Sequence, residues 1–191
     1  MPHRFAPCRG QDTRSKRARS ARGGFTLLEV LITASVLLVG LLAMTSTSVV
    51  VNSLRRNASD QQRAQAALQA LVEDLHATAR EADDDPTLWA GEVLAVYGAG
   101  GNPGNQIAVA GLDAWQGAPS VATVQIVTNE TTTDAALGVA LGMPRDLDGD
   151  GAATSNDVTA SASLLPAIVQ LRWTGSTGQH ELTQVVYLLR Y

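Results

Sequence analysis

The chain has few of the residues that build redox centres, soft metal sites or catalytic motifs. Its 191 residues include one cysteine, Cys8, which excludes an intrachain disulfide, a cysteine-based metal site and a redox pair. The three histidines, His3, His76 and His180, are scattered, and no two of them have metal-ligand spacing. The sequence contains no G-x-S-x-G motif and no H-E-x-x-H motif. We therefore do not expect an enzyme.

Charge is distributed unevenly along the chain. Residues 1–24 hold seven of the 14 basic residues and one of the 18 acidic residues. The remainder, with seven basic and 17 acidic residues, has a formal net charge of −10. This acidic remainder argues against a nucleic-acid partner. Basic charge before an apolar run is typical of a membrane protein whose N-terminal end stays in the cytoplasm.

Residues 25–51 form the apolar run, and their only charged residue is Glu29. As a helix the run would be about 40 Å long, longer than the roughly 30 Å hydrocarbon layer of a bilayer. Its far end softens at 45–48, Thr-Ser-Thr-Ser, where we expect the helix to leave the membrane. The run is longer than the apolar region of a secretory signal, and the small pair Gly23-Gly24 lies before the run, whereas a signal has its small-residue cleavage site after it. We predict a single membrane span, with the head on the non-cytoplasmic side.

Glu29 is unusual because a carboxylate inside a bilayer costs roughly 2.5 kcal/mol or more and usually marks a function. An alternative is that Glu29 lies at headgroup depth, close to the basic leader, where ionisation costs little. The residues alone leave both interpretations open.

The segment from Gly23 to Ile32, GGFTLLEVLI, resembles the prepilin signature of type IV pilins and type II secretion pseudopilins. The resemblance implies that a prepilin peptidase cuts after Gly24 and that Phe25 becomes the N-methylated first residue. It also implies that Glu29 assists assembly by facing the free amine of a neighbouring subunit. Pairing would offset the cost of two charges in hydrocarbon. The implied partners are the peptidase, other pilin or pseudopilin subunits bound through this helix, and the inner membrane.

Within this family, the stretch 36–43, VLLVGLLA, is most similar to minor pilins of the PilV type. The resemblance implies a structural subunit that helps to assemble or prime a type IV pilus. A minor pseudopilin of a type II secretion system is the alternative, and it would share the same N-terminal start. A membrane-anchored, calcium-dependent binding module is a second alternative, for which the match at Gly24 would be coincidental. The 24-residue leader is longer than is usual in the family.

Residues 52–82 are polar, but small and apolar residues recur within them at steps of three and four. The members of this stripe are Ala64, Ala67, Leu68, Leu71, Val72, Leu75 and Ala79. Such spacing predicts an amphipathic helix, and no proline or glycine interrupts 52–82. We expect one continuous helix from Phe25 to Ala82, of which 25–51 span the membrane and 52–82 form a stalk under the head. The acidic run before Pro86 closes this segment at residue 85.

Residues 86–191 are rich in Gly, Thr, Val and Ala and predict a β-rich head. The strands expected are 93–97, 106–110, 121–128, 168–174 and 181–191. The last two flank Gly175-Ser176-Thr177-Gly178 and form a hairpin. One apolar face of the final strand should pack on the long helix, and a neighbour would cover the other. The fold class is therefore α+β, with one long N-terminal helix on an antiparallel sheet, and the resemblance implies the same pilin-like architecture.

The segment 146–157, DLDGDGAATSND, fits the pattern D-x-D-x-D-G-x5-D of a calcium loop. Oxygen ligands at steps 1, 3, 5, 7, 9 and 12 would converge on one Ca²⁺, and glycine at step 6 permits the sharp turn. These ligands are Asp146, Asp148, Asp150, the backbone carbonyl of Ala152, Thr154 and Asp157. The loop resembles EF-hand-like loops, although its last ligand is not glutamate. We expect a short helix over 158–165 after the loop; a solvated acidic turn is the alternative.

Overall fold

The computed structural model describes residues 26–82, 85 and 87–190. The predicted cleavage site between Gly24 and Phe25 lies outside the described residues. Helix α1 runs from Leu27–Glu81, close to the bounds expected from the sequence. The chain divides into two compact units, Met1–Ser46 and Thr47–Tyr191, so α1 contributes its first part to one unit and its second part to the other.

The first part of α1 exposes its apolar side chains on all sides. Every described residue before Ser53 is exposed, including Leu27, Leu41 and Val49. Among the described residues, α1 is the one helix long and apolar enough to cross a membrane by length and composition. Its bare apolar surface needs a cover other than water, and this part of α1 fits membrane anchoring.

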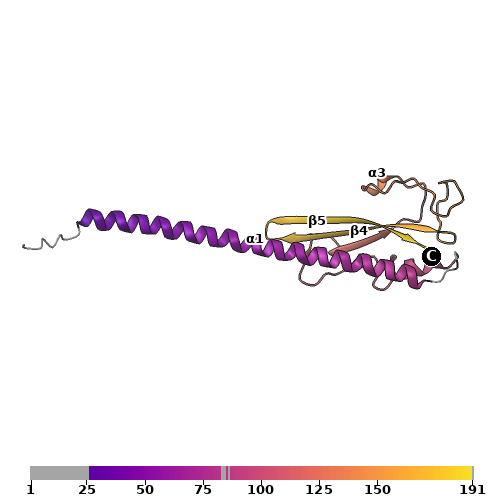
Figure 1. Cartoon of the computed structure of the whole chain (residues 1–191), viewed down its shortest axis with the longest axis horizontal. Helices are drawn as coiled ribbons and strands as arrows, with labels where there is room; N and C mark the ends of the chain where they lie inside the picture. Colours follow the sequence, from indigo (N-terminus) through magenta and orange to yellow (C-terminus); the bar gives the residue numbers. More distant parts are fainter. Residues whose placement is uncertain (1–25, 83–84, 86, 191) are drawn as a thin grey trace, which may run out of the picture. The chain divides into compact units, whose positions relative to one another are not determined.

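The second part of α1 carries the apolar stripe that the sequence predicts. Ala64, Leu68, Leu75 and Ala79 are buried in the head core, and Ala67, Leu71 and Val72 pack against it. The opposite side of the helix is polar and exposed. Figure 1 shows the β4–β5 hairpin lying along this part of α1. The helix therefore supplies one wall of the core through small and aliphatic side chains at helical spacing.

The sheet is antiparallel and is built around one central strand. Strand β4, Leu164–Gly175, pairs with β5, Gly178–Leu189, along its whole length, from Leu164↔Leu189 to Gly175↔Gly178. It also pairs with β3, Ala122–Ile126, and with the short β2, Asp113–Ala114. Strand β1, Gln106–Ile107, extends the sheet beyond β3. The long helix packed on an antiparallel sheet confirms the predicted α+β, pilin-like fold.

Helix α2, Trp89–Tyr97, corrects one expected strand. The segment 93–97 was predicted to be extended, but it forms the end of α2. Trp89, Val93 and Tyr97 are buried at steps of four, a helical spacing that a five-residue window cannot distinguish from strand alternation. The Trp89 indole N–H donates to the Ala79 carbonyl at 2.8 Å and so satisfies an oxygen near the end of α1.

The outer face of the sheet is partly covered by the segment 127–163 of the same chain. Its one helix in the described structure is the four-residue α3, Asp134–Leu137, and the rest is turns (Figure 1). Leu141, Leu147 and Val158 from this segment are buried in the common core. The Tyr187 hydroxyl of β5 donates to the Leu141 carbonyl at 2.9 Å. The chain itself thus covers part of the face for which a neighbour was expected.

The short helix expected over 158–165 is absent. A turn occupies 159–161, and β4 begins at Leu164. The Ser163 and Leu164 amides both donate to the Leu147 carbonyl, at 2.9 and 3.0 Å. A single turn remains, in which the Ser161 and Ala162 amides donate to the Val158 carbonyl at 2.9 and 2.8 Å, and the bonds to Leu147 then lead the chain into the sheet before a helix can continue.

Candidate functional site

Glu29 lies in the first turn of α1, and its carboxylate has no partner among the described residues. Its backbone N–H donates to the Thr26 carbonyl at 3.0 Å and to the Thr26 hydroxyl at 3.3 Å, so Thr26 caps the helix. The Thr33 hydroxyl donates to the Glu29 carbonyl at 2.8 Å. A carboxylate in the first turn is favoured by the helix dipole, and this one is exposed. It is free to pair with a cation from another molecule.

Hydrogen bonds from backbone N–H groups to its own carboxylates stabilise the acidic loop, 146–157. The Asp146 carboxylate accepts the N–H groups of Gly149 and Gly151 at 2.6 and 2.8 Å. These bonds, the Gly149 bond first, lower the pKa of Asp146. Both glycines have positive φ, +86° and +92°, a conformation that other residues rarely adopt. The loop therefore closes around Asp146, with glycine at both of these positive-φ positions.

Two further aspartates make local turns in the same region. Asp148 accepts the Asp150 N–H at 3.1 Å, and Asp150 accepts the Ala152 N–H at 2.7 Å. Asp157 binds farther along: it accepts the Thr159 N–H at 3.0 Å and the Thr159 hydroxyl, and these bonds lower its pKa. Each carboxylate is turned toward nearby backbone in this conformation.

Glu130 is the group at this site that the sequence analysis missed. Its side chain is fully buried, yet its carboxylate accepts four backbone N–H groups. One oxygen binds the amides of Leu147 and Asp148, and the other binds those of Thr154 and Ser155, at 2.7 to 3.3 Å. Burial raises its pKa, but the four hydrogen bonds together outweigh burial, and the net shift is downward. Glu130 therefore ties both ends of the acidic loop from the inside.

Glu130, Asp146 and Asp148 form a carboxylate triad that could hold a metal ion. One oxygen from each residue lies within 4.8 Å of the other two. Two other expected carboxylate ligands, Asp150 and Asp157, do not belong to this cluster. Thr154 gives its backbone N–H to Glu130. The structure thus brings together two of the four expected aspartates and adds Glu130 from outside the loop.

Asp134 anchors the neighbouring turn in a similar way. It starts α3, where Thr133 is the N-cap, and its carboxylate accepts the amides of Leu141, Gly142 and Met143 at 2.8 to 3.0 Å. These bonds, the Met143 bond first, lower the pKa of Asp134. Two ionised carboxylates, Glu130 and Asp134, thus replace regular secondary structure in organising 127–163.

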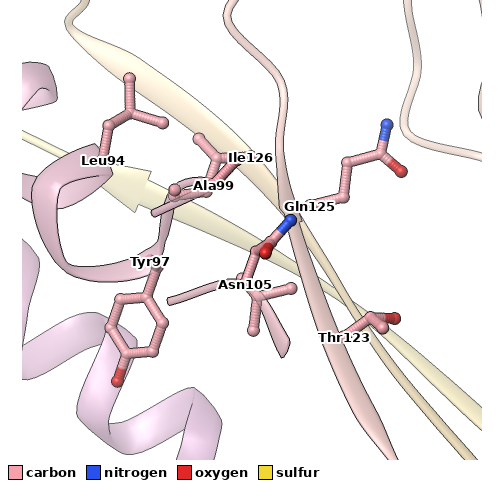
Figure 2. Close-up of a pocket in the computed structure, with 9 residues that line it drawn as sticks. Leu94, Tyr97, Ala99, Asn105, Thr123, Gln125 and Ile126 are labelled. Carbon is pink, nitrogen blue, oxygen red and sulfur yellow. The ribbon is translucent and has the colours of Figure 1, made fainter. Parts of the chain in front are cut away.

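A separate pocket of about 340 Å³ lies between α2 and β3 (Figure 2). Leu94 and Tyr97 contribute from α2, and Thr123 and Gln125 contribute from β3. The Tyr97 hydroxyl hydrogen-bonds the Asp74 carboxylate on α1, and burial together with this bond raises the pKa of Tyr97. The phenol is therefore engaged with α1, and the pocket offers a ligand mainly apolar and neutral polar groups.

One comparison with known proteins identifies the N-terminal segment. Residues 19–45 match the family model described as the prokaryotic N-terminal methylation motif. No curated protein and no solved structure matches the chain. The matched residues include Glu29 and most of the exposed apolar part of α1. This motif is the prepilin-type N-terminal signal of type IV pilins and pseudopilins.

Proposed function

We propose that this chain is a minor type IV pilin of the PilV type, cut by prepilin peptidase after Gly24, N-methylated on Phe25 and inserted into a pilus. The methylation motif over 19–45 is the observation that carries the proposal. Before assembly, α1 anchors the subunit in the inner membrane, with the basic leader in the cytoplasm and the head in the periplasm.

The exposed apolar surface of α1 supports assembly through this helix. Leu31, Val36 and Leu37 are each more than half exposed, and they lie on different sides of α1. Such a surface is stable only when lipid or other protein covers it. In the membrane lipid covers it, and in a filament the equivalent helices of neighbouring subunits take the place of lipid.

Glu29 gives this assembly a specific contact. Its carboxylate has no partner among the described residues, and burying it alone in hydrocarbon is costly. The amine released by cleavage at Gly24 on a neighbouring subunit is a suitable cation. The two charges offset each other when the subunits dock, so Glu29 favours the docked state over the free subunit in lipid.

Comparing Glu29→Gln with Glu73→Gln tests this function in cells that assemble pili. Glu73 is an exposed glutamate on the second part of the same helix and serves as the matched control. We expect Glu29→Gln to be processed and membrane-bound but depleted at least about tenfold from sheared filaments, while Glu73→Gln remains at the parent level. Equal incorporation of both variants would contradict the role of Glu29.

A minor pseudopilin of a type II secretion system would share the same motif and helix. The same experiment in cells that express a secretion system separates the two functions. Incorporation into pili without rescue of secretion supports the pilin, whereas rescue of secretion by this chain and not by a control pilin supports the pseudopilin.

The acidic loop is proposed to bind one structural Ca²⁺. Its donors are hard oxygens, which suit Ca²⁺. Ligands on opposite sides of Ca²⁺ lie about 4.6 to 5.2 Å apart, and the triad oxygens lie within 4.8 Å of one another. Four N–H groups already occupy the acceptor positions of Glu130. The carboxylates of Asp146 and Asp148 therefore offer the freer lone pairs to an ion. Small rotations would add the remaining ligands, namely Asp150, the Ala152 carbonyl, Thr154 and Asp157.

The melting temperature of the full chain, measured with Ca²⁺ and with chelator, tests this site. Ca²⁺ should raise the melting temperature of the parent and of the control Asp113→Ala, which alters an exposed residue of β2. It should leave Asp148→Ala unchanged. Equal melting of the parent in Ca²⁺ and in chelator would rule out the calcium site. A response that persists in Asp148→Ala would place the ion elsewhere.

A membrane-anchored calcium-binding module would bind Ca²⁺ but would keep residues 1–24 in cells.

A further inference from the structure

We propose that a groove at the junction of α1 and the β4–β5 turn binds the phosphate-bearing headgroup of an anionic phospholipid. The groove has a volume of about 240 Å³ and is lined by Val49, Asn52, Ser53, Arg56 and Ser176. The Ser176 hydroxyl donates to the Ser53 carbonyl at 3.1 Å, which fixes the turn against the helix. All five residues belong to the same compact unit, Thr47–Tyr191.

The lining of the groove changes from apolar to cationic along one stripe of α1. Val49, Asn52, Ser53 and Arg56 lie at steps of three, four and seven, so they share one face of the helix. Val49 forms the apolar end, the Asn52 amide lies in the middle, and the Arg56 guanidinium forms the cationic end. A phospholipid has the same order of groups, from acyl chain through ester and glycerol to phosphate.

The positive charge at this position is not neutralised within the described chain. Arg55 and Arg56 are both exposed, and neither forms an ion pair or a side-chain hydrogen bond with a described residue. Asp60 lies one turn beyond Arg56, but no ion pair joins them. A guanidinium binds phosphate oxygens through two parallel hydrogen bonds and is more weakly hydrated than an ammonium. Both arginines are therefore available to an anion from outside the chain.

The position of the groove along α1 matches headgroup depth, provided that α1 crosses the membrane. The apolar run 25–51 is longer than the hydrocarbon layer, and its polar residues 45–48 lie directly before the groove. The next residues fall in the layer of headgroups, and arginine side chains can extend toward phosphates from there. Val50, Val51 and Leu54 are also exposed beside the groove. These apolar neighbours could contact the acyl chains of a lipid, whereas they would add nothing to the binding of a free phosphate ion.

Electron paramagnetic resonance of spin-labelled lipids tests the groove on the full chain in phosphatidylcholine vesicles. The measured quantity is the protein-associated fraction of spin-labelled phosphatidylglycerol relative to that of spin-labelled phosphatidylcholine. We expect Arg55→Gln/Arg56→Gln to lower this preference by about fivefold or more, because each arginine near anionic lipid contributes an attraction of that order. Arg56→Gln alone should show a smaller drop of the same sign.

Two controls test whether the loss depends on positive charge near the membrane. Arg80→Gln removes an exposed arginine near the far end of the same helix and should leave the preference at the parent value. Arg55→Lys/Arg56→Lys keeps the charge and should retain most of the preference. The basic leader attracts anionic lipid equally in every variant, so differences between variants report Arg55 and Arg56, of which Arg56 lines the groove.

Three results would overturn the proposal. The double glutamine variant could keep the parent preference, or Arg80→Gln could lose as much as the double variant. Glycerol phosphate in solution, at millimolar concentration, could abolish the preference, which would assign the groove to a soluble anion. None of these results would affect processing at Gly24 or insertion into a filament, so failure here is distinct from failure of the pilin function.

Discussion

Two carboxylates, the buried Glu130 and the half-buried Asp134, shape the part of the head that has the least regular structure. Glu130 accepts four backbone amides and Asp134 accepts three, and each holds a turn that no helix or strand would stabilise. Ionised acceptors make stronger hydrogen bonds than neutral ones, which explains how these two side chains can order a long connecting segment.

Glu130→Gln should destabilise the head by about 2 to 4 kcal/mol, because a side-chain amide cannot accept all four N–H groups and leaves buried donors unsatisfied. Equilibrium unfolding of the full chain in detergent measures the loss. Glu73→Gln, at an exposed position on α1, is the control and should change stability by less than about 0.5 kcal/mol.

Comparing the parent with Glu130→Gln also gives a prediction for the pH dependence of stability. The pKa of Glu130 is lowered in the folded state, so its stabilisation is present above the unfolded pKa, about 4.3, and is lost as the pH falls through the folded pKa. The difference in unfolding free energy between parent and Glu130→Gln should therefore be largest at pH 6 to 7 and shrink below about pH 4. A difference that stays constant down to pH 2 would show that the Glu130 carboxylate is not the source.

At this scale the sequence predicts local geometry and misses distant partners. The acidic loop is recognisable because its aspartates and glycines have fixed short spacings, and Asp146 does close on Gly149 and Gly151. Glu130 precedes the loop by about 16 residues, with no spacing rule to connect it. Its hydrogen bonds to Leu147 and Thr154 depend on the tertiary fold, so no local pattern could have identified it.

Among the elements, the long helix and the terminal hairpin were predictable, whereas α2 was not. The helix has an uninterrupted apolar run followed by a stripe at helical spacing, and the hairpin has two alternating strands around a short turn. Helix α2 is only nine residues long, too short for its period to be distinct from an extended segment. Its conformation is decided by tertiary contacts, such as the Trp89 hydrogen bond to Ala79.

Leu75→Ala tests the packing of α1 on the head. Leu75 is fully buried in the stripe, so removal of its side chain should leave a cavity and cost about 2 to 5 kcal/mol of unfolding free energy. Leu88→Ala, at a residue that is 49% exposed, is the matched control and should cost much less. Chemical denaturation of both full-length variants measures the difference. A Leu75→Ala variant as stable as the control would mean that the stripe does not pack on the core.

At the scale of the whole molecule, charge and hydropathy together predict the direction in which the chain would cross a membrane. The basic leader precedes the apolar run and the acidic remainder follows it, the arrangement expected when basic residues stay in the cytoplasm. The exposed apolar part of α1 fits the membrane, and the methylation motif lies across the boundary between leader and helix. These three features fit membrane anchoring through α1 and are consistent with the proposed pilin function.

Intact mass and N-terminal sequencing of the membrane-extracted protein, from cells with an active prepilin peptidase, test the central claim most directly. We predict a mature chain that begins at N-methylated Phe25 and lacks residues 1–24. Gly24→Val, which places a branched side chain at the cleavage position, should retain the leader under the same conditions. A parent chain that keeps residues 1–24, in cells where a control pilin is processed normally, would contradict the pilin function.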